Sequence, residues 1–493
     1  MSRPGVSITE TTLAVPVATE SPAAATGAML AILPSGPTAP TAVTSWYQFS
    51  KVFGPLNRSF PATFAANMFF RAGGRELFVN RLIRSDATTA SAAILGDGSD
   101  AGSTADEVYL NFTAKSSGSY GNSLRVRVTI NPRGLYDVAV LQEAGVANDV
   151  TDDVLLETFT NLPVGTHGNT EVTDIINVRS QFINVAWGSD TTVVLPANLP
   201  TLTLSGGGDG TTGTYSYSTA LNRLKETERS FVVFCPGVTD SNTIESLVEF
   251  AQDTKSFVVA DTAPSLTAAQ AVTYADSLVN SDRLGVYYPQ VWIADTTSAS
   301  QNSILKVSPS GAVAGVILGT DATQGVFRAP AGIQATIPGV VALEKSLSNE
   351  ELDALNNDLN PVNALRVMPG AGPVVMGART MDQSRSTRYI NIRRTVDFLS
   401  KEMEAALAFA IFRNNTPDLW REISTVLDNF LRGFFTDGGL RGNSPSEAYF
   451  IKVDAENNNA TDIASGVVNV EVGVALQYPA EFIKIKLTQR TIA

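Results

Sequence analysis

The sequence predicts an α+β fold of several domains: an α/β core, a β-rich insertion, a C-terminal module of two helices plus β-strands, and extended strand arms at both ends. Residues 26–84 and 215–365 alternate short apolar runs with helical patterns, and residues 86–205 are rich in Ser, Thr, Asp and Gly. Residues 371–493 combine two amphipathic helical patterns with alternating strands. The 493 residues leave room for roughly two to four domains.

We place the domain boundaries where these patterns change. The sequence predicts an N-terminal arm at 1–20, a first core segment at 21–85 and the β-rich insertion at 86–205. A second core segment follows at 206–370, and the C-terminal domain with its terminal strand arm occupies 371–493. The insertion therefore interrupts the core in sequence.

The N-terminal arm is predicted to be extended. Val6 and Ile8 alternate with polar residues, while Pro4, Gly5 and Pro16 block a helix. So short a segment cannot bury a core of its own. We expect it to become ordered by pairing with the edge of another sheet.

The first core segment has a strand–helix–strand pattern. Ala28–Leu33 is apolar enough for a buried strand, Phe60–Arg71 has helical spacing that ends at Gly73–Gly74, and Leu77–Ile83 returns as a strand. This alternation is typical of an α/β layer.

The second core segment repeats the alternation. Ser230–Cys235 and Ser256–Ala260 are short apolar runs of the kind found in buried sheets. Val307–Gly311 and Arg328–Gly332 are rich in Pro and Gly and are predicted to be loops.

The insertion is predicted to contain short alternating strands. Leu124–Ile130 and Val138–Leu141 are separated by the turn sequence Asn131–Gly134. The only histidine, His167, lies in a loop next to a glycine.

Two helices are predicted in the C-terminal domain. Thr395–Arg413 carries one apolar stripe. The second helix begins at Thr416–Asp418, where Thr416 can cap and Pro417 fits the first turn, and it ends at Asp437–Gly439.

Two strands are predicted to close the chain. The first is the alternating run Val468–Leu476. In the last one, Ile483, Ile485 and Leu487 share one face.

Lys484 and Lys486 lie on the opposite face of that last strand, and two interpretations remain open. The lysines can protect a sheet edge from aggregation, or the strand can be exchanged with a neighbouring molecule. Four or five hydrogen bonds at roughly 0.5–1.5 kcal/mol each, with two or three buried side chains at about 1.5–3 kcal/mol each, would outweigh the ordering cost of a short arm.

The composition excludes several classes of protein. The net charge of −13 argues against a nucleic-acid-binding protein, and it is concentrated in residues 1–365, because residues 366–493 carry 15 Lys and Arg against 14 Asp and Glu. The single cysteine allows no internal disulfide. The N-terminus has no signal-peptide core, and the longest apolar runs are too short to span a bilayer.

No catalytic or cofactor site is predicted. Gly208–Gly213 formally fits G-x-G-x-x-G, but residues 214–218 alternate like a strand or loop where a helix should begin. Glu226 and Glu228 lie near the distance at which a dinucleotide site has its acidic residue, so this interpretation is not fully excluded. One His and one Cys provide no His/Cys metal cluster. Asp97, Asp100 and Asp106 miss the EF-hand spacing.

Cys235 is interpreted as a buried strand residue rather than as a nucleophile.

An ordered series of short motifs runs along nearly the whole chain. Each is weak alone, and their order is specific: Arg3–Glu10, Phe49–Gly54, Phe69–Gly74, Ala114–Asn122, Leu204–Gly210, Tyr287–Pro289, Pro309–Gly311, Arg328–Gly332, Gly377–Thr380, Arg388–Arg394, Asn414–Asn415, Leu419–Trp420, Gly438–Gly442, Asn457–Asn459 and Pro479–Phe482. The series resembles the tail sheath protein family of contractile bacteriophages. Gln290 departs from it, since family members often have Trp after Tyr-Tyr-Pro.

The resemblance implies a structural protein without enzymatic activity or cofactor. It implies an inner C-terminal domain against the tail tube, an outward insertion, and arms from both ends that enter the sheets of neighbouring subunits. The implied partners are further copies of the chain, the tail tube protein, and the baseplate and tail terminator proteins, with no direct nucleic acid and no membrane insertion. The implied location is the virion tail, assembled in the host cytoplasm.

The implied mechanism is mechanical: the sheath polymerises around the tube in a metastable lattice and contracts to drive the tube through the host envelope. The alternative is the sheath of an R-type bacteriocin or another contractile injection system.

Basic residues gather near the start of the C-terminal domain. Arg385, Arg388, Arg393 and Arg394, with Arg379, have only Asp382 among them. They are candidates for contact with the tube or with a neighbour's carboxylates, for which the guanidinium fork is suited. A solvated or internally paired role is the other interpretation, and nucleic-acid binding is disfavoured because no series of aromatic residues accompanies them.

Overall fold

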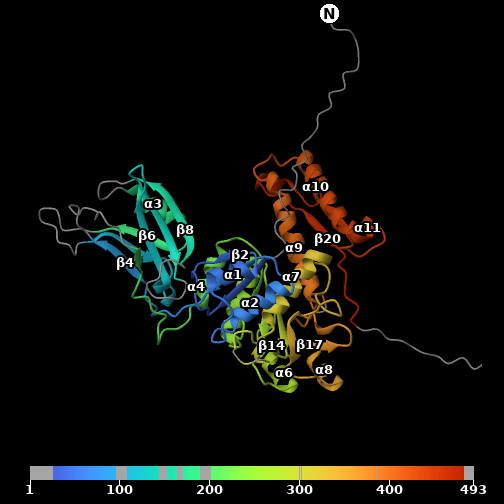
Figure 1. The fold of residues 1–493 in the computed structure, drawn as a ribbon. Helices are drawn as coiled ribbons and strands as arrows, with labels where there is room; N and C mark the ends of the chain where they lie inside the picture. The colour runs from blue at the N-terminus through green and yellow to red at the C-terminus, as the bar shows by residue number, and fades with distance from the viewer. Residues whose placement is uncertain are drawn as a thin grey trace, which may run out of the picture. The chain divides into compact units, whose positions relative to one another are not determined.

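The structure, a computed structural model, describes residues 26–95, 108–143, 153–163, 170–188, 201–298, 300, 302–384 and 386–481. These residues fall into two compact units. The larger unit comprises Ala25–Gly319 and Pro330–Arg388, and the described part of the smaller unit comprises Thr320–Ala329 and residues 389–481. The predicted mixed α/β fold of several domains is confirmed (Figure 1).

A mixed sheet forms the centre of the larger unit. Its order is β18-β17-β13-β12-β11-β1-β3-β2. The six inner strands are parallel: β1 (Thr26–Ala31), β3 (Leu77–Arg81), β11 (Phe231–Phe234), β12 (Phe257–Asp261), β13 (Leu284–Tyr288) and β17 (Val362–Met368). The edge strands β2 (Thr41–Val43) and β18 (Gly372–Val375) are antiparallel. Parallel strands buried on both faces explain why the sequence showed continuous apolar runs here.

Helices cover both faces of this sheet. On one face pack α4 (Tyr217–Lys225), α5 (Ser241–Thr254), α6 (Ala268–Asp276) and α8 (Asn349–Leu355). On the other face, Phe69 of α2 (Ala62–Arg71) stacks on Phe234 of β11 with ring centroids 5.7 Å apart. Helix α1 (Trp46–Phe53) packs against α2. The predicted helix at 60–71 and the strands at 28–33, 230–235 and 256–260 are confirmed within a few residues.

One predicted loop is wrong in part. Helix α7 (Ser310–Gln324) begins inside Val307–Gly311. The buried carboxylate of Asp261, at the end of β12, accepts hydrogen bonds from the Ser310 N–H at 2.9 Å and the Ser310 hydroxyl at 2.6 Å, which fixes the helix start. Glycines let α7 approach α2, because a Cβ atom on Gly315 would lie 2.3 Å from the carbonyl oxygen of Phe69. Tertiary contacts thus override the low helix propensity of glycine.

A separate three-stranded antiparallel sheet completes the larger unit. It has the order β15-β14-β16, formed by β15 (Ile304–Val307), β14 (Val291–Ala294) and β16 (Val340–Leu343).

The described residues between 91 and 203 form two small antiparallel sheets around one shared core. One has the order β10-β6-β7-β8, from β10 (Thr201–Thr203), β6 (Leu124–Ile130), β7 (Tyr136–Gln142) and β8 (Val154–Leu162). The other has the order β4-β5-β9, from β4 (Ser91–Leu95), β5 (Val108–Ala114) and β9 (Ile183–Trp187). Helix α3 (Thr170–Arg179) packs on this core, and η1 (Ser119–Ser123) precedes β6. His167, Asp97, Asp100 and Asp106 lie outside the described residues.

The smaller unit pairs helices with a short sheet. It contains α9 (Ile390–Ala406), η2 (Ala408–Ala410), α10 (Pro417–Thr436), α11 (Pro445–Ala448), β19 (Tyr449–Lys452), α12 (Ala460–Ala464) and β20 (Glu471–Val474), drawn in orange to red in Figure 1. Helix α10 begins and ends where the sequence predicts, although the side chain of Thr416 makes no capping hydrogen bond.

Two predictions in the smaller unit need correction. Helix α9 begins five residues before the predicted Thr395 and ends at Ala406, because the chain turns through η2 to Phe412, whose φ of 62° is incompatible with a right-handed helix. The predicted strand 468–476 is shorter, and its partner is β19, which the sequence analysis missed.

Candidate assembly interface

The two-stranded sheet of the smaller unit is covered on one face. Tyr449 and Ile451 of β19, with Val472 and Val474 of β20, pack against apolar side chains of α9 and α10. Tyr449 also donates a hydrogen bond to Asp428 of α10 at 2.7 Å, and this bond lowers the pKa of the Asp428 carboxyl. The helices therefore hold the sheet from one side.

The opposite face of this sheet carries an exposed aromatic ring. Phe450 is 53% exposed and faces Gly473 across the strand pair. A Cβ atom on Gly473 would lie 2.1 Å from the Phe450 ring, so the ring occupies the space next to this glycine. The ring therefore adds apolar area to the uncovered face of the sheet.

The outer edge of β20 presents backbone groups for pairing. The Ala475 N–H donates to the Ala448 carbonyl at 2.8 Å, so 448 and 475 form a hydrogen-bonded pair. Because such pairs alternate along an antiparallel ladder, the N–H and C=O groups of Val472 and Val474 point away from β19. No other segment among the described residues pairs with that edge. The geometry can accept an additional strand.

A second apolar feature lies between α9 and α10. Ile411 is 67% exposed, and Phe412 is as exposed as in an isolated peptide. The positive φ of Phe412 is rare for a bulky residue, and such strain is often found at functional positions. The neighbouring Arg413 forms an ion pair with Glu422 at 2.8 Å, so the tip of this loop is apolar and close to neutral.

Three of the four predicted arginines can be placed, and each is paired within the chain. Arg388 lies 3.1 Å from Asp358 in the larger unit, and Arg393 lies 2.7 Å from Asp397 one turn along α9. Arg394 binds both carboxylate oxygens of Asp321, at 2.7 and 2.5 Å, with both side chains almost fully buried. Arg385 lies outside the described residues.

These pairings favour the internal interpretation for Arg393 and Arg394. Both side chains are mostly buried, and their carboxylate partners are too. Arg388 differs, since its partner Asp358 is 74% exposed and also lies 3.4 Å from Arg379. Contact of Arg385, Arg388, Arg393 and Arg394 with the tube or with a neighbouring copy stays a prediction.

The predicted arm residues Val6, Ile8, Ile483, Lys484, Ile485, Lys486 and Leu487 all lie outside the described residues.

The glycine-rich loop is a turn that joins two parts of the larger unit. Asp209 accepts hydrogen bonds from the Ser119 N–H at 2.9 Å and from the buried Arg81 at 3.1 Å. The Asn122 amide pairs with the backbone of Gly207 through two bonds of 2.8 Å. No helix opens from these glycines, because α4 begins only at Tyr217. The geometry of a dinucleotide site is not met.

The core cysteine is buried, and the described acidic residues form no metal-type cluster. Cys235 is buried directly after β11, and burial raises the pKa of its thiol far above the usual range, which disfavours the nucleophilic thiolate. Within the described ranges, no three His, Cys, Asp or Glu side chains gather as a metal site would require.

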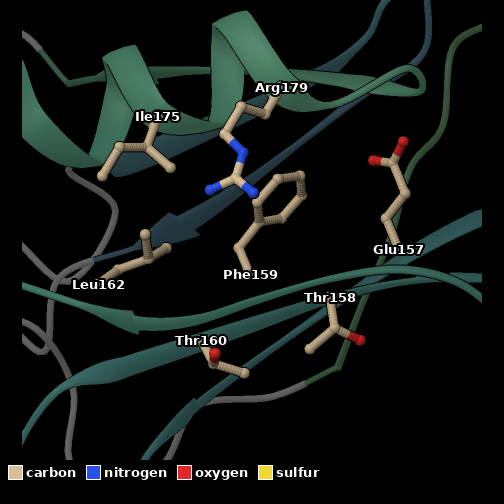
Figure 2. A pocket seen from close by; sticks show the side chains of 7 residues that line it. All are labelled: Glu157, Thr158, Phe159, Thr160, Leu162, Ile175 and Arg179. Carbon is tan, nitrogen blue, oxygen red and sulfur yellow. The ribbon is translucent and has the colours of Figure 1, made fainter.

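A pocket of about 320 Å³ lies beside α3 and β8 (Figure 2). Its lining comprises Glu157, Thr158, Phe159, Thr160, Leu162, Ile175 and Arg179. The Glu157 carboxylate is already engaged, because it accepts hydrogen bonds from the Ser180 hydroxyl and the Gln181 N–H, both at 2.7 Å. The carboxylate therefore fixes the turn after α3, and the lining forms no recognisable acid–base or metal site.

Comparisons with known proteins agree with the sequence motifs. Residues 210–381, less than half of the chain, match the model of the phage tail sheath protein central domain. No curated protein sequence matches the chain. The fold is that of contractile sheath proteins, as three solved structures show.

Two of these structures come from contractile particles. The helical sheath of the anti-feeding prophage in its contracted state is 20% identical with a TM-score of 0.59, covering 99% of this chain and 100% of that one. The contracted sheath of the PVC extracellular contractile injection system is 18% identical with a TM-score of 0.59, covering 99% and 98%.

The third structure is the sheath tail protein of Listeria innocua, which is 14% identical with a TM-score of 0.59, covering 92% and 95%. The resemblance to the contractile tail sheath family that the sequence indicates is thereby confirmed.

No helix among the described residues is both long and apolar enough to cross a bilayer.

Proposed function

We propose that this protein is the structural sheath subunit of a contractile, phage-like injection system. Copies of the chain polymerise around a tube and contract, and the chain performs no catalysis. The match of residues 210–381 to the sheath central domain, together with a sheath fold over the whole chain, is the observation that carries this proposal.

The open edge of β20 supports an assembly made by strand sharing. Two predicted segments have a polar and an apolar face but no core of their own: the N-terminal arm at 1–20 and the C-terminal strand at 483–487. Residues 475–481 connect β20 to this C-terminal segment in the sequence. A neighbour's arm added to this edge would gain main-chain hydrogen bonds and cover apolar side chains.

The free energy for contraction comes, in this proposal, from contacts between subunits. The outward-facing rings of Phe412 and Phe450 supply apolar surface that assembly can bury. Heterologous contacts between identical subunits give a helix or stacked rings, and an assembly barrier can trap an extended lattice. The tube protein, baseplate and tail terminator are the proposed partners. The anti-feeding prophage and PVC similarities fit a bacterial injection system as well as a phage tail.

Truncation tests the proposal. Deleting residues 1–12 or 482–493 should leave a folded monomer and abolish ordered tubes, because the removed segments belong to sheets of other copies. Electron microscopy of the overexpressed protein and its melting curve measure both properties. Normal tubes from either truncation would contradict strand sharing at that end.

A further inference from the structure

The chain is fastened to the smaller unit immediately after β20. The Arg441 N–H donates to the Ala475 carbonyl at 2.8 Å, and Leu476 forms an antiparallel bridge with Leu440. Leu476 also packs into the apolar cluster beneath the sheet. The strand direction of β20 is therefore continued for two residues beyond its end.

Gln477 is the strongest point of this attachment. Its side-chain amide donates to the carbonyls of Gly438 at 2.7 Å and Leu440 at 3.0 Å. Its own carbonyl accepts from the Asn391 amide at 3.1 Å. Asn391 is 2% exposed and also donates to the Phe327 carbonyl at 2.9 Å, so the amide that holds Gln477 is itself fixed.

A second, exposed attachment follows within four residues. The ring of Tyr389 meets the ring of Tyr478 edge to face, with centroids 6.4 Å apart. The Tyr389 hydroxyl donates to the Glu481 carboxylate at 2.8 Å. Glu481 lies two residues before the predicted arm strand at 483–487, so this bond is made at the base of that arm.

We propose that Tyr389 and Glu481 form an exit latch that sets the direction in which residues 482–493 leave the subunit. Gln477 and Asn391 provide the fixed pivot behind the latch. All four are positioning residues: they present the arm to a neighbouring copy, and they make no contact with that copy themselves. This inference rests on the proposed sheath function.

The physical reason is preorganisation. A segment that leaves in one direction loses less conformational freedom when a neighbour captures it than a segment that swings about Gln477. Removing the latch should therefore slow strand capture while leaving the fold of the subunit unchanged. The loss of this one exposed hydrogen bond should lower the rate or the equilibrium constant of strand capture by a factor of about three to ten.

The test compares Tyr389→Phe, Glu481→Ala and the double variant in the full-length protein. Asp418→Asn is the matched control, because it removes another exposed carboxylate contact, with Arg421 at the start of α10, in the same unit. Light scattering follows tube growth, electron microscopy confirms tubes, and thermal unfolding reports the fold of the monomer.

We expect Tyr389→Phe and Glu481→Ala each to slow tube growth about three- to tenfold at an unchanged melting temperature. The double variant should be no slower than the slower single variant, since both changes remove the same bond. Asp418→Asn should grow tubes at the wild-type rate.

Three results would overturn the latch: wild-type growth by both single variants, faster growth by either, or effects that multiply in the double variant. If Tyr389→Phe lowers the melting temperature, the exposed Glu481→Ala variant alone decides. Wild-type protein that forms no tubes would instead overturn the proposed function itself.

Discussion

The sheets of the two units differ in how completely they are covered. In the larger unit, β1, β11, β12 and β13 are buried along their whole length, and helices lie on both faces. In the smaller unit, only Tyr449 of the eight residues in β19 and β20 is buried. The first sheet is covered on both faces within one subunit, whereas the second has an open edge and an uncovered face that another molecule can cover.

This difference indicates that the two units have different roles in the proposed assembly. The larger unit resists change because its elements interlock through close contacts and buried side chains. In the smaller unit, packing and hydrogen bonds hold the helices and the segment 475–481. The outer edge of β20 has no strand partner among the described residues, and the rings of Phe412 and Phe450 are exposed. In the proposed sheath, the subunits would move as rigid bodies while the open edges keep them connected.

The largest expected effect comes from breaking the buried ion pair of the smaller unit. Asp321→Asn leaves the bidentate Arg394 buried without a charge partner, which should cost about 3–5 kcal/mol. Asp418→Asn is the control, since the Asp418–Arg421 pair is largely exposed and should contribute about 0.5 kcal/mol or less. Hydrogen exchange in α9 and α10 measures both, and equal protection in the two variants would refute the role of the buried pair.

A smaller effect is expected from two helix glycines in contrasting surroundings. Gly315→Ala in α7 forces a Cβ atom to within 2.3 Å of the Phe69 carbonyl oxygen and should destabilise the larger unit by about 1–3 kcal/mol. Gly433→Ala in α10 meets open space and should stabilise the smaller unit by about 0.5–1 kcal/mol. Denaturant unfolding gives the sign of each change, and the same sign for both would contradict the close packing of α7 on α2.

The last expected effect is a change in the pH dependence of stability. Burial raises the pKa of Asp261 to about 6, against hydrogen bonds from Ser310 and Gly237 that lower it. The folded state therefore keeps this proton to a higher pH than the unfolded state does. The stability that protonation contributes is present below about pH 4 and is lost as the pH rises through about 6.

Asp240 provides the opposite case for comparison. It caps α5 at the surface, and hydrogen bonds from Thr243 lower its pKa, so its contribution is lost as the pH falls. The titration of Asp261 makes the wild-type protein less stable as the pH rises from 4 to 7. Unfolding curves over this range should show that Asp261→Asn no longer has this decrease, whereas Asp240→Asn keeps it. An unchanged pH slope in Asp261→Asn would show that the carboxyl titrates normally.

Local patterns predicted much of this fold correctly. The apolar runs of β11 and β12 indicate buried strands, and Thr416–Pro417 and Asp437–Gly438 mark the ends of α10. These signals depend on neighbouring residues, so the sequence contains them directly.

Features that depend on distant residues were not predictable in this way. Helix α7 begins in a segment predicted as a loop because Asp261, 49 residues earlier, binds Ser310. The Arg394–Asp321 pair joins residues 73 apart. Strand β19 was missed because Tyr449–Lys452 is too short to show an alternating pattern. Tyr389 and Gln477 gave no recognisable signal, since their role follows from where the fold places the chain exit.

The most direct test of the account is a high-resolution cryo-electron microscopy map of the assembled protein. The account predicts that residues 483–487 of one copy lie hydrogen-bonded to a β-sheet in the smaller unit of a different copy. A map in which both terminal segments fold back onto their own subunit, with no sheet shared between molecules, would contradict it.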